Sequence, residues 1–288
     1  MTVLINKDTK VLVQGITGKS GLLQTELMQA AGTKIVAGVT PGKGGQVASG
    51  VPVYNFVSEA KKEHDFEAVI SFVPPYAAKS SSIEAIDSGI SLLVLTTEGI
   101  PQHDVIDIVA YAHNKRVVMI GPGCAGIIAP EVSKVGSHPA RFFKKGQVGV
   151  VSKSGALSYE IGKTLCDAGI GQSAVIAIGG GPVWGFTQRD AVELFENDSD
   201  TKVIVLLGEI GGSLEETAAK YIADNVRKPV VALIVGRNAP AGKSLGHAGA
   251  IVSGGVGTAA TKISALKDAG VVVVKNPEEL VTEVKKHL

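Results

Sequence analysis

Short apolar runs recur along the first half of the chain and alternate with segments of helical character, such as residues 20–32 and 79–89. The runs are KVLVQG (10–15), KIVAGV (34–39), AVISFV (68–73), SLLVLTT (91–97) and RVVMIG (116–121). Continuous apolar strands that alternate with helices are typical of a parallel sheet covered on both faces. The pattern predicts a doubly wound, Rossmann-like domain.

The second half repeats this rhythm, with helical segments over residues 154–169 and 213–226. Its apolar runs are QVGVVS (147–152), SAVIAIG (173–179), KVIVLLGE (202–209), PVVALIVG (229–236) and GVVVVKN (270–276). The rhythm breaks at SHPARFFKKG (137–146), whose basic residues we expect in solvent. The chain is therefore predicted to form two α/β domains, residues 1–140 and 147–288.

Composition narrows the class of protein. Of the 288 residues, 45% are hydrophobic and 19% are charged, which is typical of a folded chain. The net charge of +1 does not favour nucleic acid or an anionic membrane as a partner. Two cysteines, Cys124 and Cys166, are too few for a disulfide scaffold and indicate reduced thiols.

The N-terminus and the lengths of the apolar runs bear on location. The first ten residues, MTVLINKDTK, contain no signal or transit pattern, and the longest apolar runs are of strand length. We therefore expect no membrane span and a cytoplasmic protein of a prokaryote. A mitochondrial matrix location is expected only if a transit peptide has been removed.

A glycine-rich turn follows the first predicted strand. In QGITGKSG, Gly15, Gly18 and Gly21 are spaced so that backbone amides at a helix N-terminus can approach a phosphate group. Glycine can also serve only to turn the chain. The turn alone leaves both interpretations open.

The region after the second predicted strand favours a particular ligand. Dinucleotide-binding domains place an acidic residue there for the ribose hydroxyls, but residues 27–58 contain no Asp or Glu. Instead, Lys43 lies between glycines in VTPGKGG, where its charge suits a phosphate. Coenzyme A, with its pyrophosphate and 3′-phosphate, fits this pattern, and NADP is the competing ligand.

Polar residues also follow the fourth predicted strand. Thr96, Thr97 and Glu98 in TTEGIP stand at the carboxyl end of a parallel strand, where open sheets bind ligands. Glu98 could equally be a favourable charge near a helix N-terminus.

A second turn of this kind occurs in SKSGALSYE (152–160). Ser152, Ser154 and Gly155 are expected to expose backbone amides as an anion site, and ordinary serine capping of the helix is compatible with that role.

One histidine lies in an unusual context. His247 is surrounded by small residues in GKSLGHAGAIVSGGVG (242–257), which suggests close approach to its ring or a loop that needs hinge freedom. Glu209, at the end of a buried strand, could orient such an imidazole by accepting from one ring nitrogen. Both residues could also be structural. We expect no metal ligands, because no Cys or His near His247 has metal-ligand spacing. The remaining histidines, expected at the surface, are His64, His103, His113, His138 and His287.

Six ordered motifs together resemble the α subunit family of succinyl-CoA synthetase (succinate–CoA ligase, ADP- or GDP-forming). They are QGITGKSG, GVTPGKGG, TTEGIP, SKSGALSYE, GEIGGS and GHAGAI, and the resemblance spans essentially the whole chain. It implies an N-terminal Rossmann-like CoA-binding domain and a C-terminal flavodoxin-like ligase domain. It also implies a β subunit whose ATP-grasp fold binds ATP or GTP with Mg²⁺, in an αβ or α₂β₂ assembly.

The resemblance also implies roles for single residues. His247 matches the transiently phosphorylated histidine, Glu209 the acid that pairs with it, and Tyr159 a tyrosine at the acid-substrate site. The anion site predicted from the turn at Ser154 and Gly155 would bind the phosphoryl group on His247. The residues that would bind CoA are Thr17, Gly18, Lys19, Ser20, Lys43, Thr96, Thr97 and Glu98. The implied reaction converts succinate, CoA and NTP into succinyl-CoA, NDP and phosphate through a phosphohistidine and an acyl phosphate.

Two departures from the family pattern leave the acid substrate open. The family reads G-P-N-C-P-G where this chain has GPGCAG (121–126), with Gly123 and Ala125 at the changed positions. The family also reads G-G-D-P where this chain has GGGP (179–182), followed closely by Trp184. A ligase for malate or another small acid is therefore the alternative. An NADP-dependent oxidoreductase and a non-catalytic CoA-binding regulator remain as more distant ones.

Overall fold

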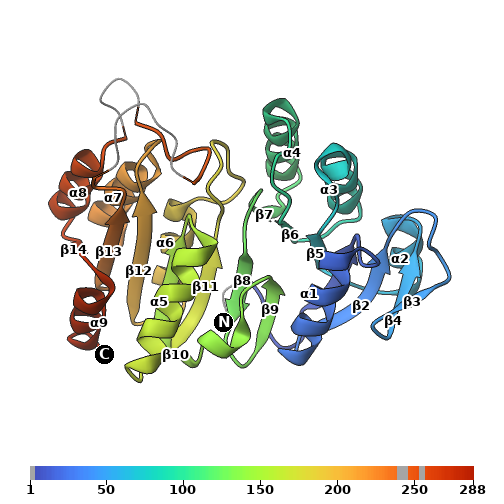
Figure 1. Cartoon of the computed structure of the whole chain (residues 1–288), viewed down its shortest axis with the longest axis horizontal. Helices are drawn as coiled ribbons and strands as arrows, with labels where there is room; N and C mark the ends of the chain where they lie inside the picture. The colour runs from blue at the N-terminus through green and yellow to red at the C-terminus, as the bar shows by residue number, and fades with distance from the viewer. Residues whose placement is uncertain (1–3, 239–245, 253–256) are drawn as a thin grey trace. The chain divides into compact units, whose positions relative to one another are not determined.

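The computed structural model describes residues 4–238, 246–252 and 257–288, which fold into two compact α/β units (Figure 1). The first unit contains Leu4–His138 together with Val183–Phe186, and the second contains Pro139–Pro182 and the described part of Thr187–Leu288. Of the glycine-rich stretch 242–257, residues 242–245 and 253–256 lie outside the described residues.

The first unit is built on a sheet with the order β3-β4-β2-β1-β5-β6-β7. Its pairings are parallel except between β3 and β4. From β4 onward this is the Rossmann order, in which the strand order reverses between β1 and β5. The predicted Rossmann-like fold is confirmed. The strands are β1 (Lys10–Gln14), β2 (Lys34–Val39), β3 (Val47–Ala48), β4 (Val51–Tyr54), β5 (Ala68–Ser71), β6 (Leu92–Leu95) and β7 (Val118–Ile120).

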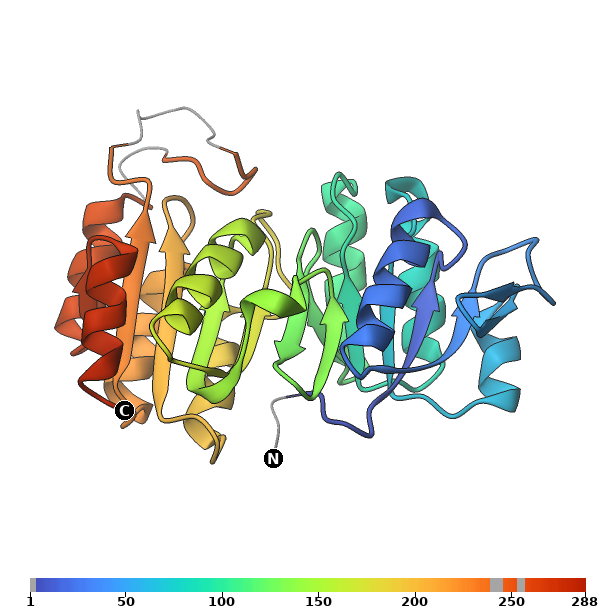
Figure 2. The same ribbon diagram turned by 60° about the horizontal axis from the view of Figure 1, so that its bottom comes forward.

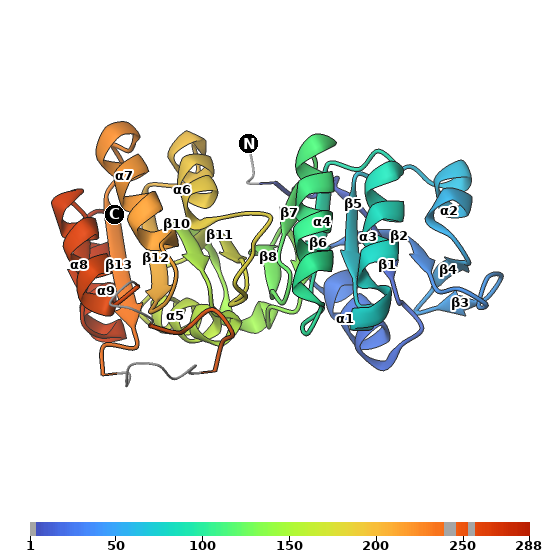
Figure 3. The ribbon, with the colours of Figure 1, turned by 90° about the horizontal axis from the view of Figure 1, so that it is seen from above.

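Helices cover both faces of this sheet. Figure 2 is a view from the side of α1 (Lys19–Ala30), and Figure 3 is a view from the side of α3 (Ala78–Asp87) and α4 (Gln102–Asn114). The helix α2 (Val57–Glu63) contacts α3, which contacts α4. Because both faces are covered, β5 and β6 are buried along their whole length, which explains their continuous apolar sequences.

An antiparallel hairpin completes the first unit. It consists of β8 (Gly126–Ala129) and β9 (Ser133–Gly136), with β9 in contact with α1. The sequence pattern did not predict this hairpin. Its strands are buried on both faces, so they lack the alternation of polar and apolar residues that marks a half-exposed strand. The first unit also has a short 3₁₀ helix, Pro75–Ala77, and a second one, Ala140–Phe142, belongs to the other unit.

One of the histidines expected at the surface is buried instead. His138 has an exposed fraction of 0%, and it lies beside Lys134, which is also buried and donates from Nζ to the His138 carbonyl at 3.0 Å. Burial, followed by the nearby Lys134 charge, lowers the pKa of His138 to about 3. Burial also lowers the pKa of Lys134 to about 8.

The second unit has five parallel strands in the order β14-β13-β12-β10-β11. Counted within the unit, this is the order 5-4-3-1-2, which is the flavodoxin-like arrangement. The predicted flavodoxin-like fold is therefore confirmed as well. The strands are β10 (Lys145–Ser152), β11 (Gln172–Ala177), β12 (Val203–Glu209), β13 (Val230–Val235) and β14 (Val272–Val274).

Two groups of helices pack on this second sheet. The helices α6 (Gln188–Asn197), α7 (Leu214–Asn225) and α8 (Ala259–Asp268) contact one another in succession. The helices α5 (Gly155–Asp167) and α9 (Pro277–Lys285) form the other contacting pair and lie in front of the sheet in Figure 2. In this doubly wound arrangement the strand order reverses between β10 and β12, and open α/β sheets bind ligands beside the loops that follow such strands.

None of the helices among the described residues is long and apolar enough to span a bilayer.

Candidate active site

The carboxylate of Glu209 holds the imidazole of His247. Glu209 is the last residue of β12, at the carboxyl end of a central strand beside the point where the strand order reverses. Its Oε2 lies 2.7 Å from Nδ1 of His247. The Glu209 side chain is 8% exposed and the His247 side chain 31%. An imidazole that donates from Nδ1 to a carboxylate carries its lone pair on Nε2. The expected pairing of these two residues is present in the structure.

The ring of His247 packs against the backbone of Gly180, in the turn that follows β11. A Cβ atom on Gly180 would come within 2.2 Å of Cγ of His247. The N–H of Gly249 donates to the Gly180 carbonyl at 3.0 Å and ties the histidine loop to this turn. The side chain therefore has a close neighbour, which comes from another loop and not from the small residues beside it in sequence.

Glycines in three loops let their backbones touch around the histidine. A Cβ on Gly211, which follows β12, would lie 1.9 Å from the carbonyl oxygen of Gly249. The N–H of Gly211 also donates to the carbonyl of Gly257 at 2.8 Å. Close packing of backbones thus requires the small residues at these positions, which is a reason that the sequence pattern did not reveal.

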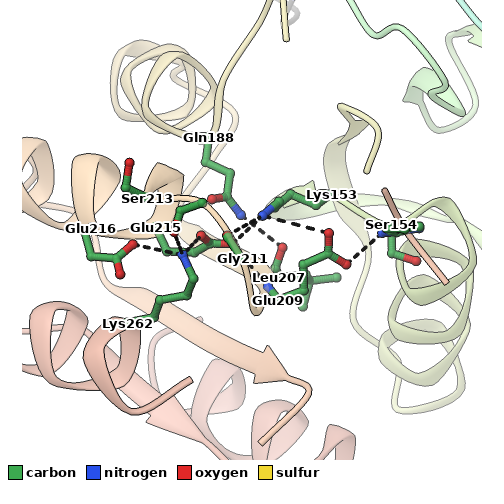
Figure 4. Close-up of polar contacts among 12 residues, drawn as sticks. Lys153, Ser154, Gln188, Leu207, Glu209, Gly211, Ser213, Glu215, Glu216 and Lys262 are labelled. Atoms are coloured by element: carbon green, nitrogen blue, oxygen red, sulfur yellow. Dashed lines mark hydrogen bonds and ion pairs between the residues drawn. The ribbon is translucent and has the colours of Figure 1, made fainter. Parts of the chain in front are cut away.

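A row of buried charges lies behind Glu209 (Figure 4). Lys153, which follows β10, has its Nζ 3.8 Å from Oε1 of Glu209 and 3.4 Å from Oε1 of Glu215. Lys262 of α8 lies 2.6 Å from Oε2 of Glu215 and 2.9 Å from Oε2 of Glu216. Lys153, Glu215 and Lys262 are almost completely buried. Their burial could not be predicted, because nothing in the local sequence marks a lysine as buried.

The turn that begins α5 differs in part from the expectation. The N–H of Ser154 donates to Oγ of Ser152 at 3.1 Å, so this amide is occupied and not exposed to a ligand. Oγ of Ser154 caps the helix by accepting from Leu157. The amides of Gly155 and Ala156 open the helix, and no contact with the described residues occupies them. They are the groups at this turn that remain available to an anion.

Tyr159 lies on α5, in the second turn of the helix, with a half-buried side chain.

The turn between β1 and α1 has the geometry of a phosphate-binding turn. Gly15 has φ of +75°, and a Cβ on Gly21 would lie 2.1 Å from the Gly15 carbonyl oxygen, so both glycines are needed for the close approach of helix and strand. The helix begins after Gly18, with no side-chain cap and no acidic residue in its first turn. Lys19 and Ser20 are exposed there, and such a helix N-terminus favours an anion.

Thr17 and Lys43 lie on neighbouring turns of this edge. The Thr17 hydroxyl donates to that of Thr40 at 3.2 Å, which links the turn after β1 to the turn after β2. Lys43 is exposed between two glycines. The side-chain oxygen of Asn55 accepts from the N–H groups of Gly42 and Gly44 at 2.8 and 3.1 Å. Asn55 thus fixes the loop that presents Lys43, although no motif in the sequence points to it.

The residues after β6 reach the same edge of the sheet. The hydroxyls of Thr96 and Thr97 donate to the carbonyls of Ser71 and Val73, both at 2.7 Å. These bonds use the threonine protons within the protein, so the hydroxyl oxygens remain as acceptors. Glu98 is exposed. The three residues lie with Lys43 and the α1 turn at the carboxyl edge of one parallel sheet.

The segment GPGCAG (121–126) follows β7, and its last residue, Gly126, begins β8. Gly123 has φ of +64°, a conformation that glycine and asparagine adopt most readily, so Gly in place of the family's Asn preserves the backbone. Cys124 is buried, and its thiol contacts the carbonyls of Leu95 and Ile120 at 3.4 Å. Burial raises the pKa of this thiol to about 12.

The segment after GGGP returns to the first unit. The N–H of Gly185 donates to the carbonyl of Gly121 at 3.0 Å, and a Cβ on Gly185 would collide with Met119. Trp184 belongs to this segment. Among the described residues, no group of three or more His, Cys, Asp and Glu side chains could hold a metal ion.

Two family models match the chain. The model of the CoA binding domain covers residues 6–99, and that of the CoA-ligase domain covers residues 151–272. The first contains the α1 turn and Lys43, and the second contains Glu209 and His247. The chain thus carries a CoA-binding domain followed by a CoA-ligase domain.

Solved structures share the fold. The ATP citrate lyase from Methanothrix soehngenii, in complex with citrate and coenzyme A, superposes with a TM-score of 0.90 at 25% identity over 99% of this chain. This chain corresponds to 51% of that lyase, or about half its length. A dinucleotide-forming acetyl-coenzyme A synthetase from Ca. Korarchaeum cryptofilum shares the fold with a TM-score of 0.75, at 20% identity over 95% of this chain and 59% of its own.

Curated relatives match from end to end. The ADP-forming succinate–CoA ligase subunit alpha of Aquifex aeolicus is 48% identical over 290 residues, covering 100% of this chain and 95% of its own. The protein of that name from Methanothermobacter thermautotrophicus is 49% identical over 286 residues, covering 99% and 97%. With the paired His247 and Glu209 on a flavodoxin-like unit and a glycine-rich turn on a CoA-binding domain, the chain belongs to the family of succinate–CoA ligase alpha subunits.

Proposed function

We propose that this chain is the α subunit of a succinate–CoA ligase, which interconverts succinate, CoA and NTP with succinyl-CoA, NDP and phosphate. The observation that carries the proposal is the contact of 2.7 Å between Nδ1 of His247 and the Glu209 carboxylate. A histidine oriented through one ring nitrogen presents the other as a nucleophile. Relatives that carry this name are 48–49% identical over the whole chain.

In the first step, Nε2 of His247 attacks the γ-phosphorus of the NTP with its lone pair. The bond between that phosphorus and the bridging oxygen breaks, and NDP leaves with the electron pair. The proton on Nδ1 stays in place and continues to donate to Glu209. The ring becomes a phosphorylated imidazolium, and the Glu209 carboxylate balances its positive charge.

Two further transfers complete the reaction. A carboxylate oxygen of succinate attacks the phosphorus, the N–P bond breaks, and His247 regains its lone pair. The resulting succinyl phosphate is attacked at the acyl carbon by the sulfur of CoA. The C–O bond to phosphate breaks, phosphate leaves, and the thiol proton is released to solvent. Covalent catalysis thus divides one transfer into easier steps.

Groups on each unit would bind the substrates. Thr17, Gly18, Lys19 and Ser20 would hold phosphate groups of CoA at the N-terminus of α1, with Lys43 as a further cation. Thr96, Thr97 and Glu98 would line the same edge. On the second unit, the amides beginning at Gly155, after the Ser154 cap, would stabilise the phosphoryl group, and Tyr159 would contact the acid.

A partner subunit would supply the nucleotide site. ATP or GTP, together with Mg²⁺, would bind to a β subunit with an ATP-grasp fold, in an αβ or α₂β₂ assembly. The support is that the relatives are named as alpha subunits of an ADP-forming enzyme. The two cysteines are free thiols, which fits a reducing compartment such as the cytoplasm.

The decisive experiment is phosphoryl labelling. The chain is reconstituted with its partner subunit and incubated with Mg²⁺ and γ-³²P-labelled ATP or GTP. We expect an acid-labile, base-stable phosphate on this chain and none on the His247→Asn variant. Label that persists at the same level in that variant would overturn the proposal. A screen of succinate against malate then tests the acid, and a clear preference for malate would replace succinate as the substrate.

A further inference from the structure

The charges behind Glu209 alternate in sign along one row. From the active site inward the order is Glu209, Lys153, Glu215, Lys262 and Glu216, with N–O distances of 3.8, 3.4, 2.6 and 2.9 Å (Figure 4). They come from four elements, the ends of β10 and β12 and the helices α7 and α8. Of these groups, Lys153 forms the ion pair with Glu209, and Lys262 and Glu216 lie farther along the row.

Such a row is not explained by stability alone. The side chains of Lys153 and Lys262 are 1% and 0% exposed, and removing charges from water costs about as much as their mutual attraction returns. An apolar cluster of the same volume would stabilise the fold at least as well. The row also leads to one place, the carboxylate that holds His247.

The two oxygens of Glu209 have different partners. Oε2 faces Nδ1 of His247 at 2.7 Å. Oε1 accepts no hydrogen bond from the described residues, and its ion partner is Nζ of Lys153 at 3.8 Å. The Glu209 carboxylate therefore lies between the imidazole and a buried lysine.

Lys153 is itself held in place. Its Nζ contacts the carbonyl of Gly211 at 3.4 Å and Oε1 of Glu215 at 3.4 Å. That same oxygen of Glu215 accepts from the backbone N–H of Glu209 at 3.1 Å. Glycine at position 208 makes room for the Glu215 side chain, because a Cβ on Gly208 would lie 2.7 Å from Cγ of Glu215. Lys153 thus pairs with the Glu209 carboxylate directly, and it also contacts the Glu215 oxygen that holds the Glu209 backbone.

We propose that Lys153 is a positioning residue that acts through Glu209 to keep Nε2 of His247 unprotonated and nucleophilic at neutral pH. A carboxylate alone favours the imidazolium, which has no lone pair on Nε2 to attack phosphorus. A buried cation beside the carboxylate opposes that second positive charge. The inference rests on the proposed function, because it concerns the phosphorylation of His247.

The test is the pH dependence of phosphohistidine formation in the reconstituted complex. The first-order rate of labelling by Mg²⁺ and γ-³²P-ATP is measured across pH 5–9 for the wild type, Lys153→Gln and Lys153→Arg. For Lys153→Gln we expect the acid limb of the profile to move about one pH unit upward, so that the rate is about tenfold lower on the part of the acid limb that lies below both midpoints. Lys153→Arg keeps the charge, so its acid limb stays near that of the wild type. An acid limb that does not move in the Gln variant overturns the inference, as does an equal shift in both variants.

A double variant tests whether Lys153 acts through Glu209. Lys153→Gln/Glu209→Gln removes one buried cation and one buried anion together, so it leaves no unpaired buried charge. The test can therefore be made even if the Lys153→Gln variant does not fold. If Lys153 acts through Glu209, the double variant labels at the rate of Glu209→Gln alone. A double variant that is tenfold slower than Glu209→Gln assigns Lys153 an independent role and overturns the inference.

The wild-type measurement separates the two proposals. Absence of label on His247 in the wild type refutes the proposed function. Normal labelling of the wild type, with an unchanged profile in Lys153→Gln, refutes the role of Lys153 alone. Circular dichroism of each variant checks that a lower rate reflects the folded enzyme.

Discussion

The imidazole of His247 and the backbone of Gly180 are in direct contact, with no room for even a methyl group between them. A Cβ on Gly180 would lie 2.2 Å from the ring. The Gly180→Ala substitution must therefore displace the ring from Glu209. A displacement of about 1 Å at a reacting group can cost about 10²-fold in rate, and we expect a loss of that size in His247 labelling.

Gly246→Ala is the matched control in the same loop. A Cβ on Gly246 would meet no atom of the described residues within 4 Å, although its φ of +78° adds a backbone cost of about 1 kcal/mol. We expect it to retain most of the labelling rate. Equal losses in the two variants would show that the contact with Gly180 has no special part in placing the ring.

Lys43 is expected to bind a phosphate of CoA. Replacing it with Ala removes a charge-assisted contact, which we expect to raise KM for CoA about tenfold with little change in kcat. The measurement is repeated with 3′-dephospho-CoA. If Lys43 contacts the 3′-phosphate, the substitution has no effect on KM for this analogue.

Lys7→Ala is the control for general electrostatic attraction, since Lys7 is another exposed lysine of the first unit. An equal rise in KM in both variants would argue against a specific contact. A rise for Lys43→Ala that persists with 3′-dephospho-CoA would place its partner elsewhere on the ligand.

Stability of the first unit is expected to fall in mild acid because His138 is buried in its neutral form. Its pKa is lowered to about 3 in the folded protein, while the unfolded chain takes up the proton near pH 6.5. Between these values the unfolded state binds more protons, so the free energy of unfolding decreases as pH falls. From pH 6.5 to 5.0 the loss is about 2 kcal/mol.

Urea unfolding at pH 7 and pH 5, followed through a probe in the first unit, measures this loss. In the His138→Leu variant the decrease over this range is expected to be smaller by about 2 kcal/mol. An identical decrease in the variant would show that other groups cause the acid sensitivity.

The two cysteines are expected to differ sharply in reactivity. Burial raises the pKa of Cys124 to about 12, and the thiolate is the form that reacts with alkylating agents. Iodoacetamide at pH 8 should therefore modify half-buried Cys166 and leave Cys124 intact in the folded chain. Peptide mass spectrometry reports both sites, and unfolding in urea should make both reactive. Rapid alkylation of Cys124 in the folded chain would contradict the burial argument.

Local sequence patterns were sufficient for the main strands of both sheets. The run at 202–209 predicted β12, which spans Val203–Glu209, because a strand covered on both faces must be apolar throughout. The bounds of this strand predicted that Glu209 lies at its carboxyl end. The family motifs predicted its pairing with His247, 38 residues away.

The surroundings of these residues could not be predicted in this way. Lysine is ordinarily exposed, and the burial of Lys153 and Lys262 depends on Glu215, which a different helix supplies. The occupied amide of Ser154 depends on the rotamer of Ser152. The role of Gly180 is a tertiary contact, and nothing in the sequence near His247 points to it.

The short segment Val183–Phe186 makes the division of the molecule discontinuous along the polypeptide. The chain passes between units after His138, after Pro182 and after Phe186. A fragment that ends at His138 lacks Gly185, whose N–H donates to the Gly121 carbonyl at 3.0 Å. Recombination between two relatives at a single cut after His138 would therefore assemble the first unit from two parents. A functional chimera needs residues 183–186 to travel with the parent that supplies residues 4–138.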